Sequence, residues 1–428
     1  MNKYADFDEN FNNLGLWYSP LCYKKGMIFY MKNNVFDFKS GESELQTKRI
    51  NKKRIILLLL IILLAGIAIS LLTLYSINEE FRDFWDYTVL RKEIESSEVK
   101  SIALEKDNLK FSHSYDKRIV ILEKNTLKCY NQDGNLETQF ELNIANPLYH
   151  DCNRFLVVAE KSGKKIYLIN ENNMMWQKDL EGDISQIYVN KNGYVGVAMT
   201  TTGYKTIIVL YNPSGEELFR TYLPTTYCID MEISNDNKYM AIAELNTSGT
   251  MIETFIKIIS IESAKTKPQE AFIATYNANS NNMILNIKYT DSGKLIAMYD
   301  NGIFYASDNM EEILSVSSNT IFADIESTNK VVSIEKQNTS LLNINYVLKI
   351  YNTSSEKTLE YNLKEIPKEL YVKDNTIVIS YGTDVEIVSA QSGWLLKKYV
   401  SRQNIKNVLI SSGFVAIEYS DQIKFIKI

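Results

Sequence analysis

Two histidines are the first residues to consider for chemistry in this sequence. Histidine is the commonest general base and a frequent metal ligand, because its ordinary pKa lies close to neutral pH. The chain has only two, His113 and His150, which lie near expected strand ends about one repeat apart. They could face a common end of a repeating fold and act together. Alternatively, each is a turn or edge histidine and the two have no joint role.

Other patterns typical of catalysis or metal binding are missing from the sequence. There is no HExxH, Walker loop, GxSxG or calcium-loop pattern. The stretch "NQDGN" at Asn131–Asn135 lacks the ligand spacing and distal Glu of a calcium loop and is interpreted as a hairpin turn. We therefore expect no catalytic residue, no cofactor and no metal. A buried carboxylate with a raised pKa is the acid–base group that such a pattern search does not detect.

The cysteines do not change this expectation. The sequence contains Cys22, Cys129, Cys152 and Cys228, and no two of them form a CxxC pair or another metal-like spacing. The last three fall in apolar segments with strand character. We interpret them as buried thiols rather than as a disulfide framework.

Eight copies of a weak repeat must position any site in the second part of the chain. Each copy is a turn of small polar residues followed by a strand with alternating apolar and polar residues, then by a second strand, a turn containing Gly or Asn, and a third strand. The turn-and-strand units read "YDKRIVILEK", "DCNRFLVVAE", "KNGYVGVAMT", "NDNKYMAIAEL", "DSGKLIAMYD", "STNKVVSIEK", "KDNTIVISYG" and "SSGFVAIEYS".

The period of this repeat predicts an all-β propeller. Successive copies begin about 35–55 residues apart, which is the size of a four-stranded propeller blade. We expect roughly eight blades, or seven if the long fourth copy (residues 230–280) or the short fifth is irregular. The last copy has only three strands, and a spare strand, Val99–Leu104, precedes the first copy. We expect this strand to close the ring as the outer strand of the last blade, because an open ring leaves exposed sheet edges.

The turns after the third strands resemble a known repeat. The stretches "YNPSGEELFRTY", "INENNMMWQKDL", "YNQDGNLETQF" and "SAQSGWLLKKYV" resemble the Gly- and Trp-containing turn of PQQ-like (quinoprotein or WD40-like) propellers. Together with an N-terminal anchor, the pattern resembles a family of membrane-anchored propeller proteins of clostridia-like bacteria, of unknown function. The resemblance implies a fold and a topology but no activity.

The sequence departs from the quinoprotein enzymes in two respects. Those enzymes repeat the tryptophan in most blades, whereas only Trp176 and Trp394 occupy comparable places here, with Phe219 and Phe140 as substitutes in two other copies. No acidic constellation matches their calcium and cofactor ligands. The resemblance therefore implies no bound quinone.

A single long apolar segment precedes the repeats. Residues Ile55–Ile77 contain no charged side chain and are long enough to cross a bilayer as a helix. The residues Lys48, Arg49, Lys52, Lys53 and Arg54 precede the segment, and acidic residues follow it. Basic residues beside a membrane span stay in the cytoplasm. The sequence thus predicts a single-pass membrane protein with a cytoplasmic N-terminus.

This topology divides the chain into a cytoplasmic tail (1–54), a transmembrane helix (55–77), a juxtamembrane stalk (78–96) and an extracytoplasmic propeller (97–428). The net charge is −5 overall, and ten Lys or Arg against six Asp or Glu give residues 1–54 a charge of +4. The remainder carries −9, which argues against nucleic acid as a partner.

The longest loops are the candidate binding elements. They run from Leu245 to Glu253 and from Ile261 to Phe272 in the fourth copy, with a third at Ser333–Tyr346 in the sixth. Long loops on a propeller face often carry function, although a tolerated surface insertion has the same appearance.

These observations favour a protein-binding or scaffolding module at the outer face of the cell membrane, with a protein or peptide partner on the propeller. The first alternative is a transmembrane ligand sensor that signals through the N-terminal tail, which is rich in Phe, Tyr and Trp. The second is an extracytoplasmic PQQ-like enzyme, which the missing motifs disfavour.

Overall fold

The computed structural model describes residues 52–78, 81–82, 85, 89, 100–277, 282–326, 329–338 and 344–428. The chain divides into two units, Met1–Ala65 and Gly66–Ile428. The predicted cytoplasmic tail up to residue 51, with Lys48 and Arg49, lies outside the described residues, as does most of the predicted stalk.

Helix α1 covers Lys52–Ile77. It is built from Leu, Ile and Ala with no proline, and the hydroxyls of Thr73 and Ser76 donate to carbonyl oxygens of Ile69 and Leu72 one turn earlier (3.0 and 2.8 Å). Residues Ile56–Ile77 are long and apolar enough to cross a membrane, and none of this stretch is buried within the structure. The prediction of one N-terminal apolar helix that could cross a membrane is confirmed.

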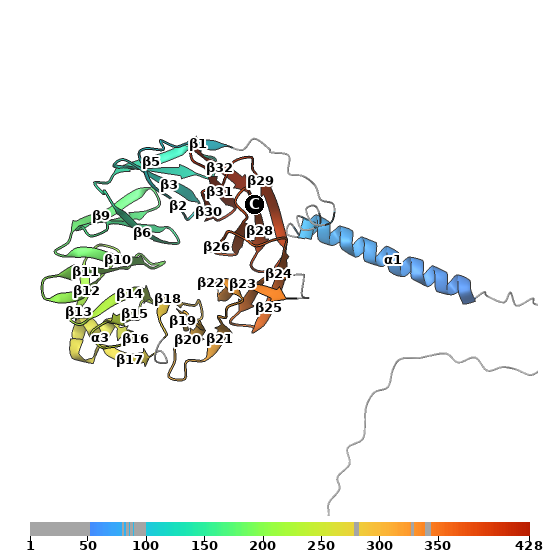
Figure 1. The fold of residues 1–428 in the computed structure, drawn as a ribbon. Helices are drawn as coiled ribbons and strands as arrows, with labels where there is room; N and C mark the ends of the chain where they lie inside the picture. Colours follow the sequence, from blue (N-terminus) through green and yellow to red (C-terminus); the bar gives the residue numbers. More distant parts are fainter. Residues whose placement is uncertain are drawn as a thin grey trace, which may run out of the picture. The chain divides into compact units, whose positions relative to one another are not determined.

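The rest of the described chain is all-β and forms an eight-bladed propeller. The described residues contain eight four-stranded antiparallel sheets, arranged around a common centre (Figure 1). Within each sheet the strands follow the order of the chain, except in the sheet that joins the two ends of the ring. The predicted propeller with eight blades is therefore confirmed, and the seven-bladed alternative is not observed.

The first strand of each blade lies nearest the centre (Figure 1). These innermost strands are β2 (Leu109–Tyr115), β6 (Pro147–Cys152), β10 (Asp183–Val189), β14 (Thr226–Ile233), β18 (Ile284–Tyr289), β22 (Thr320–Glu326), β26 (Glu369–Lys373) and β30 (Asn407–Ser411). The second strands are β3 (Arg118–Glu123), β7 (Phe155–Glu160), β11 (Val195–Thr201), β15 (Tyr239–Asn246), β19 (Leu295–Tyr299), β23 (Lys330–Asn338), β27 (Thr376–Ser380) and β31 (Phe414–Glu418).

The outer half of each blade consists of the third and fourth strands. The third strands are β4 (Thr126–Asn131), β8 (Lys165–Asn170), β12 (Tyr204–Tyr211), β16 (Glu253–Ser260), β20 (Gly302–Tyr305), β24 (Ile344–Asn352), β28 (Asp384–Ser389) and β32 (Gln422–Lys427). The fourth strands are β5 (Leu136–Glu141), β9 (Asn173–Asp179), β13 (Glu217–Leu223), β17 (Phe272–Asn277), β21 (Glu312–Ser315), β25 (Lys357–Leu363), β29 (Leu395–Val400) and β1 (Ser101–Ala103).

The antiparallel order gives the propeller two different faces. Turns between first and second strands, and between third and fourth strands, lie on one face, which we call face A. Turns between second and third strands, and the links from one blade to the next, lie on the opposite face, face B. Both definitions follow from the strand order alone.

The eighth blade is completed by both ends of the propeller sequence. Strand β1 pairs antiparallel with β32 in the register Ser101↔Lys424, Ile102↔Ile423 and Ala103↔Gln422. Ile102 is buried against Phe425 and neighbouring apolar residues. The predicted closure by the spare strand at Val99–Leu104 is confirmed, and the pairing satisfies an edge that would otherwise remain open.

The hydrophobic core lies mainly between neighbouring blades. One apolar cluster joins the second and third blades and includes Val157, Leu168 and Val197. Trp176 packs against this cluster, and a Cβ on Gly215 of the third blade would lie 3.0 Å from its indole ring. The tryptophan of the PQQ-like turn in the second blade, Trp176, thus packs between two blades.

Blades four and five differ in length. In the fourth blade β16 has 8 residues and β17 has 6, whereas β20 and β21 of the fifth blade have 4 residues each. The outer half of the fifth blade is therefore too short to cover the surface that the fourth blade presents to it.

Candidate functional site

Ionisable side chains from the innermost strands meet at the centre of the ring. We call them the centre cluster. Its members, one or two from each of six blades, are His113, His150, Asp151, Asp230, Glu232, Lys288, Asp324 and Lys373.

Asp151 joins three blades at this position. Its Oδ1 lies 2.6 Å from His113 Nε2 on the first blade, and its Oδ2 accepts from Lys373 Nζ on the seventh blade at 2.9 Å. Lys373 also donates to the carbonyl oxygen of Ser114 at 2.5 Å. Burial alone would raise the pKa of Asp151, but the charges of Lys373 and His113 outweigh it and hold that pKa well below its usual range.

A second part of the cluster is acidic and surrounds Lys288. Burial raises the pKa of Glu232 to about 8 and that of Asp230 to about 6, and it also raises the pKa of Asp324. The charge of Lys288 acts on all three carboxyls in the opposite direction. Glu232 accepts a hydrogen bond from the hydroxyl of Tyr188, so this buried carboxyl has a partner within the chain.

His150 lies on the strand next to His113 but has a separate partner. Its Nδ1 accepts from the backbone N–H of Val189 at 3.2 Å, and its ring centroid lies 4.5 Å from that of Tyr188. Burial lowers the pKa of His150 to about 4. The structure therefore brings the two predicted histidines to the same region, but each bonds to a different blade and they share no hydrogen bond.

The hydrogen bonds of the centre cluster hold blades together. The innermost strand of a blade has an edge without a strand partner, so its backbone groups need side-chain partners. Asp230 Oδ2 accepts from the N–H of Ile287 on the next blade at 2.9 Å, in the same way that His150 accepts from Val189. Among the described residues, no group of three or more His, Cys, Asp or Glu is arranged to hold a metal ion.

Sequence reasoning found the two histidines of this cluster and missed its other members. Its carboxylates and lysines belong to short stretches such as "IDMEI" and "NIKY", which look like ordinary alternating strands. The sequence does contain one signal of the cluster: a charged residue recurs near the end of the first strand in several copies. Two of the cluster's bonded members, Asp151 and Lys373, lie 222 residues apart in the chain.

The candidate loops at Leu245–Glu253 and Ile261–Phe272 lie on opposite faces of the ring. They are attached to opposite ends of β16, which carries 8 residues. Leu245 and Glu253 flank the β15–β16 turn on face B, where Leu245 pairs with Thr254 and Asn246 with Glu253. The two loops therefore do not form one surface.

Exposed tyrosines gather beside the first loop on face B. The rings of Tyr204 and Tyr222 lie 4.8 Å apart, and Lys205 Nζ lies 4.8 Å above the ring of Tyr227. Lys205 also donates to the hydroxyl of Thr247 in the loop at 3.1 Å. We call the five exposed apolar members of this region the tyrosine patch: Tyr204 (40% exposed), Tyr222 (46%), Tyr227 (43%), Met251 (58%) and Ile252 (58%).

The second loop is part of the folded core. It forms helix α3 (Ile261–Thr266), capped by the Ser260 side chain, and a short 3-10 helix, η2 (Pro268–Glu270). Ile261 and Ala264 are buried in the apolar cluster that joins the third and fourth blades, whereas Phe272 at the end of the loop is 47% exposed. The third loop, at Ser333–Tyr346, includes residues 339–343, which lie outside the described residues.

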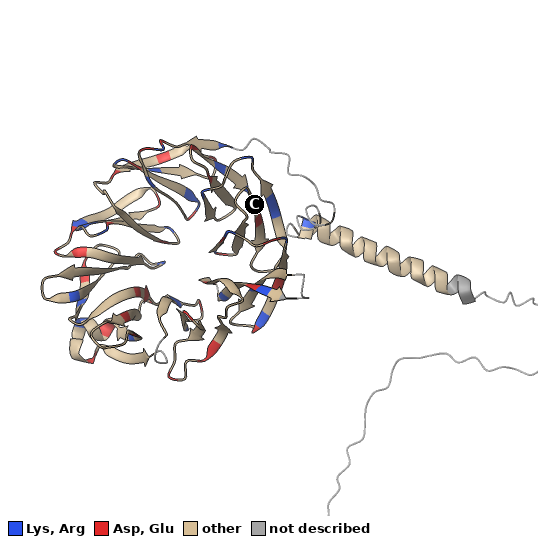
Figure 2. Cartoon of the chain, viewed as in Figure 1, with Lys and Arg blue, Asp and Glu red and all other residues tan. Residues whose placement is uncertain are grey.

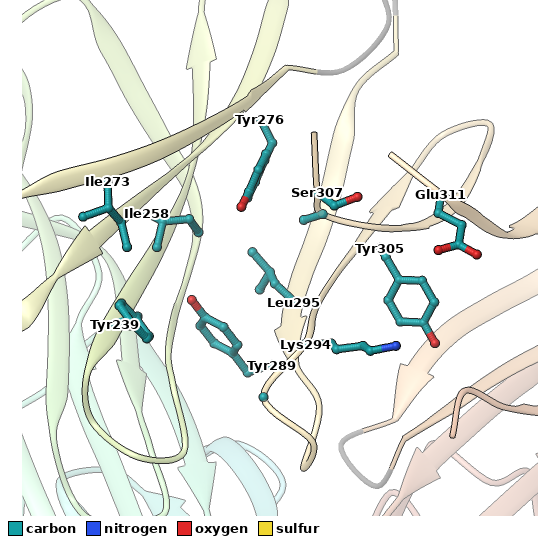
Figure 3. A pocket seen from close by; sticks show the side chains of 12 residues that line it. Tyr239, Ile258, Ile273, Tyr276, Tyr289, Lys294, Leu295, Tyr305, Ser307 and Glu311 are labelled. Carbon is teal, nitrogen blue, oxygen red and sulfur yellow. The ribbon is translucent and has the colours of Figure 1, made fainter. Parts of the chain in front are cut away.

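A cavity of about 420 Å³ lies between the fourth and fifth blades at face A (Figure 3). Tyr239, Tyr276, Tyr289 and Tyr305 line it together with aliphatic residues, and Lys294 and Glu311 are its charged members. No sequence motif marks this cavity, because it arises from the difference in length between two blades.

The propeller surface carries charges of both signs. Figure 2 shows Lys and Arg interspersed with Asp and Glu around the ring rather than gathered in one basic region.

The propeller matches a known family along its whole length. A family model for DUF5711, described as a family of unknown function, matches residues 90–428. The chain belongs to the DUF5711 family. The clostridial and membrane-anchored features of the resemblance lie beyond what this DUF5711 match shows.

Solved structures of low sequence identity align with most of this DUF5711 chain. The C-terminal WD40 domain of Sif2 aligns with a TM-score of 0.52 and 12% identity over 77% of this chain and 98% of that one. Sqt1 from Saccharomyces cerevisiae aligns with a TM-score of 0.51 and 10% identity over 77% and 98%. BamB from Moraxella catarrhalis aligns at 0.46 and 12% over 77% and 97%. No curated protein matches the DUF5711 sequence. These likenesses show the fold alone.

Proposed function

We propose that this chain is a single-pass membrane protein whose propeller acts as a protein-binding or scaffolding module at the outer face of the cell membrane. The tyrosine patch carries this proposal. Tyrosine is enriched at protein interfaces because it buries a large ring and keeps a hydrogen-bonding hydroxyl. Three tyrosines, one methionine and one isoleucine lie exposed on and beside one loop. Such a cluster of large side chains is typical of the residues that carry most of the binding energy in a protein interface.

The position of the patch is compatible with a tethered propeller. Strand β1 begins at face A, so the segment that precedes it joins the ring on that face. The patch lies on face B, at the other ends of the strands.

The orientation of the chain in the membrane rests on the charge on either side of α1. Lys52, Lys53 and Arg54 precede the apolar segment, and the positive-inside rule then assigns the propeller to the outside. A Gly249→Cys substitution in the exposed β15–β16 turn tests this assignment. We expect a membrane-impermeant maleimide to label that cysteine in intact cells and to leave a Ser40→Cys variant unlabelled. Labelling of Gly249→Cys only after the cells are opened would contradict the proposed topology.

The binding role is tested by substitutions in the patch. A variant with Tyr222→Ser and Tyr227→Ser should lose a co-purifying partner in mild detergent while its thermal unfolding stays unchanged. The matched control is Ile366→Ser with Val400→Ser, because these side chains are 55% and 68% exposed away from the patch. Equal recovery of the same partner by all three proteins would contradict a docking role for the patch.

A transmembrane ligand sensor is the second candidate, and the cavity between the fourth and fifth blades is the observation that favours it. A sensor needs a ligand site in the outer domain, and this cavity has a volume typical of small-molecule sites. The aromatic tail that would report inside the cell lies outside the described residues. Ligand enclosed in inverted membrane vesicles, whose lumen the propeller faces in this topology, should then change the protease sensitivity of that tail.

A further inference from the structure

The cavity between the fourth and fifth blades has two chemically different halves. Figure 3 shows Tyr239, Ile258, Ile273, Tyr276, Tyr289 and Leu295 together in one half, and Lys294, Tyr305 and Glu311 in the other. The docking surface on face B does not involve these residues. A molecule that fills both halves must carry an apolar group and charged groups.

The apolar half has a rigid floor and an open rim. Ile258, Leu295 and Tyr289 are 7%, 6% and 8% exposed, and they belong to the apolar cluster that joins the two blades. Ile273, on the fourth strand of the longer blade, is 51% exposed because no strand of the shorter blade covers it. An aromatic ring or a branched aliphatic group would bury this surface and gain the usual benefit of apolar burial.

The charged half offers one cation and one anion. Lys294 Nζ lies 4.6 Å from the centroid of the Tyr305 ring, and Figure 3 shows Lys294 and Glu311 flanking that ring. Tyr305 is held in place because its hydroxyl donates to the carbonyl oxygen of Thr353 at 3.0 Å. Within the described residues Lys294 and Glu311 form no ion pair with each other or with a third residue. The two charges are therefore free to meet a ligand that carries both signs.

We propose that this cavity binds a free α-amino acid with a large apolar side chain, such as phenylalanine or leucine. Its carboxylate would meet Lys294, its ammonium group would meet Glu311, and its side chain would lie on Ile258, Leu295 and Tyr289. A zwitterionic amino acid carries both charges on neighbouring atoms beside one apolar group, so it matches both halves at once. The end of a peptide carries only one of the two charges at its terminal residue.

Three ligands with the same ring separate these contributions. L-Phenylalanine carries both charges, 3-phenylpropionate only the carboxylate and phenethylamine only the ammonium group. Calorimetric titration of the full-length chain in detergent should show L-phenylalanine binding about tenfold or more tightly than either single-charge ligand, since a charge-assisted contact is typically worth a factor of that size.

Two substitutions assign each contact. Lys294→Gln should reduce the affinity for L-phenylalanine to about that for phenethylamine, and Glu311→Gln should reduce it to about that for 3-phenylpropionate. The matched control is Lys238→Gln, because Lys238 is an exposed lysine of the neighbouring turn on face A and is paired with Asp236 instead. All four proteins should unfold at the same temperature, because the substituted side chains are exposed.

Several results would overturn this inference. One is binding of all three ligands with equal affinity, which would indicate an apolar site without charge recognition. Others are tighter binding of one single-charge ligand than of L-phenylalanine, unchanged affinity in both cavity variants, and no heat of binding for L-phenylalanine at millimolar concentration. None of these results would affect the docking role of the tyrosine patch, which lies on the other face.

Discussion

The centre cluster and the tyrosine patch place opposite kinds of side chain in unusual surroundings. At the ring centre, charged and polar groups are half-buried, and they bond across blades: Asp151 bonds to His113 and Lys373, and Asp230 to the N–H of Ile287. In the patch, large apolar rings such as Tyr222 and Tyr227 are nearly half exposed. The charged groups of the centre are bonded to other groups of the chain, whereas much of the apolar surface of the patch remains open to solvent.

This difference separates structural residues from candidate binding residues. A buried charge that has partners is costly to disturb, because removing one partner leaves the other unpaired in a poorly solvated place. Removing an exposed ring changes the stability of the free protein little. The ring contributes binding free energy only when a partner covers it. Residue type alone would have suggested the reverse, since His113 and Asp151 resemble a catalytic pair more closely than Tyr227 resembles a site.

The largest expected effect comes from opening the ring. A soluble chain of residues 97–428 should unfold cooperatively, whereas one of residues 107–428 lacks β1 and should aggregate, because β32 and the apolar surface under Ile102 become exposed. Circular dichroism melts and light scattering report both properties. Equal melting temperatures for the two chains would show that the seam is not required to keep the ring centre intact.

A single substitution at the centre should have the next largest effect. Asp151→Ala leaves Lys373 and His113 without their shared anion, and we expect a loss of about 3–5 kcal/mol in the free energy of unfolding. Asp308→Ala, at an exposed turn, is the control and should change this free energy by less than about 0.5 kcal/mol. Urea denaturation measures both. Similar small losses for the two variants would remove the distinction between the centre and the surface.

Glu232 should give the centre a characteristic pH dependence. Its pKa is about 8 in the folded state against 4.5 as the ordinary value, so the folded state holds more protons between these values and stability falls as pH rises through this window. In Glu232→Gln this contribution is absent. The melting temperature of the wild type should therefore drop by several degrees between pH 6.5 and 8.5 relative to the variant, and parallel curves would contradict the assignment.

His150 should act with the opposite sign at lower pH. Its pKa is about 4 when folded, below its ordinary value of 6.5, so stability that is present above pH 6.5 is lost as pH falls toward 4. His150→Asn retains an acceptor for the Val189 N–H and removes the titration. We expect a flatter stability profile for this variant between pH 4 and 6.5 in thermal melts, and an unchanged slope would argue against a His150 that stays neutral in the folded state.

The smallest effect on stability is expected at the patch. Tyr222→Ser with Tyr227→Ser should change the free energy of unfolding by less than about 1 kcal/mol, because each ring already contacts water. Differential scanning fluorimetry is sufficient for this comparison. A loss as large as that of Asp151→Ala would mean that these tyrosines stabilise the ring rather than await a partner.

The sequence was sufficient to predict the propeller but not its sites. Alternating strands such as "FLVVAE" and the left-handed turn residues Asp116 and Asn153 have local signals, and the three-stranded last copy made closure by Val99–Leu104 predictable. The centre cluster depends on contacts such as Lys373 to Asp151, whose spacing carries no local signal. The cavity depends on a length difference between neighbouring blades. The loop at Leu245–Glu253 was predictable from its length, but Tyr204 and Tyr222 beside it come from the third blade and Tyr227 from the first strand of the fourth.

A photo-crosslinking amino acid at position 227 tests the docking surface most directly. The residue would be introduced in place of Tyr227 in the full-length chain, and in place of Val400 as a control of equal or greater exposure, and cells would be irradiated before lysis. We predict one discrete crosslinked protein from position 227 that is absent from position 400 and that disappears when Met251 and Ile252 are replaced by Ser. The same crosslinks from both positions, or none from position 227, would contradict the proposal that this face of the propeller binds a protein partner.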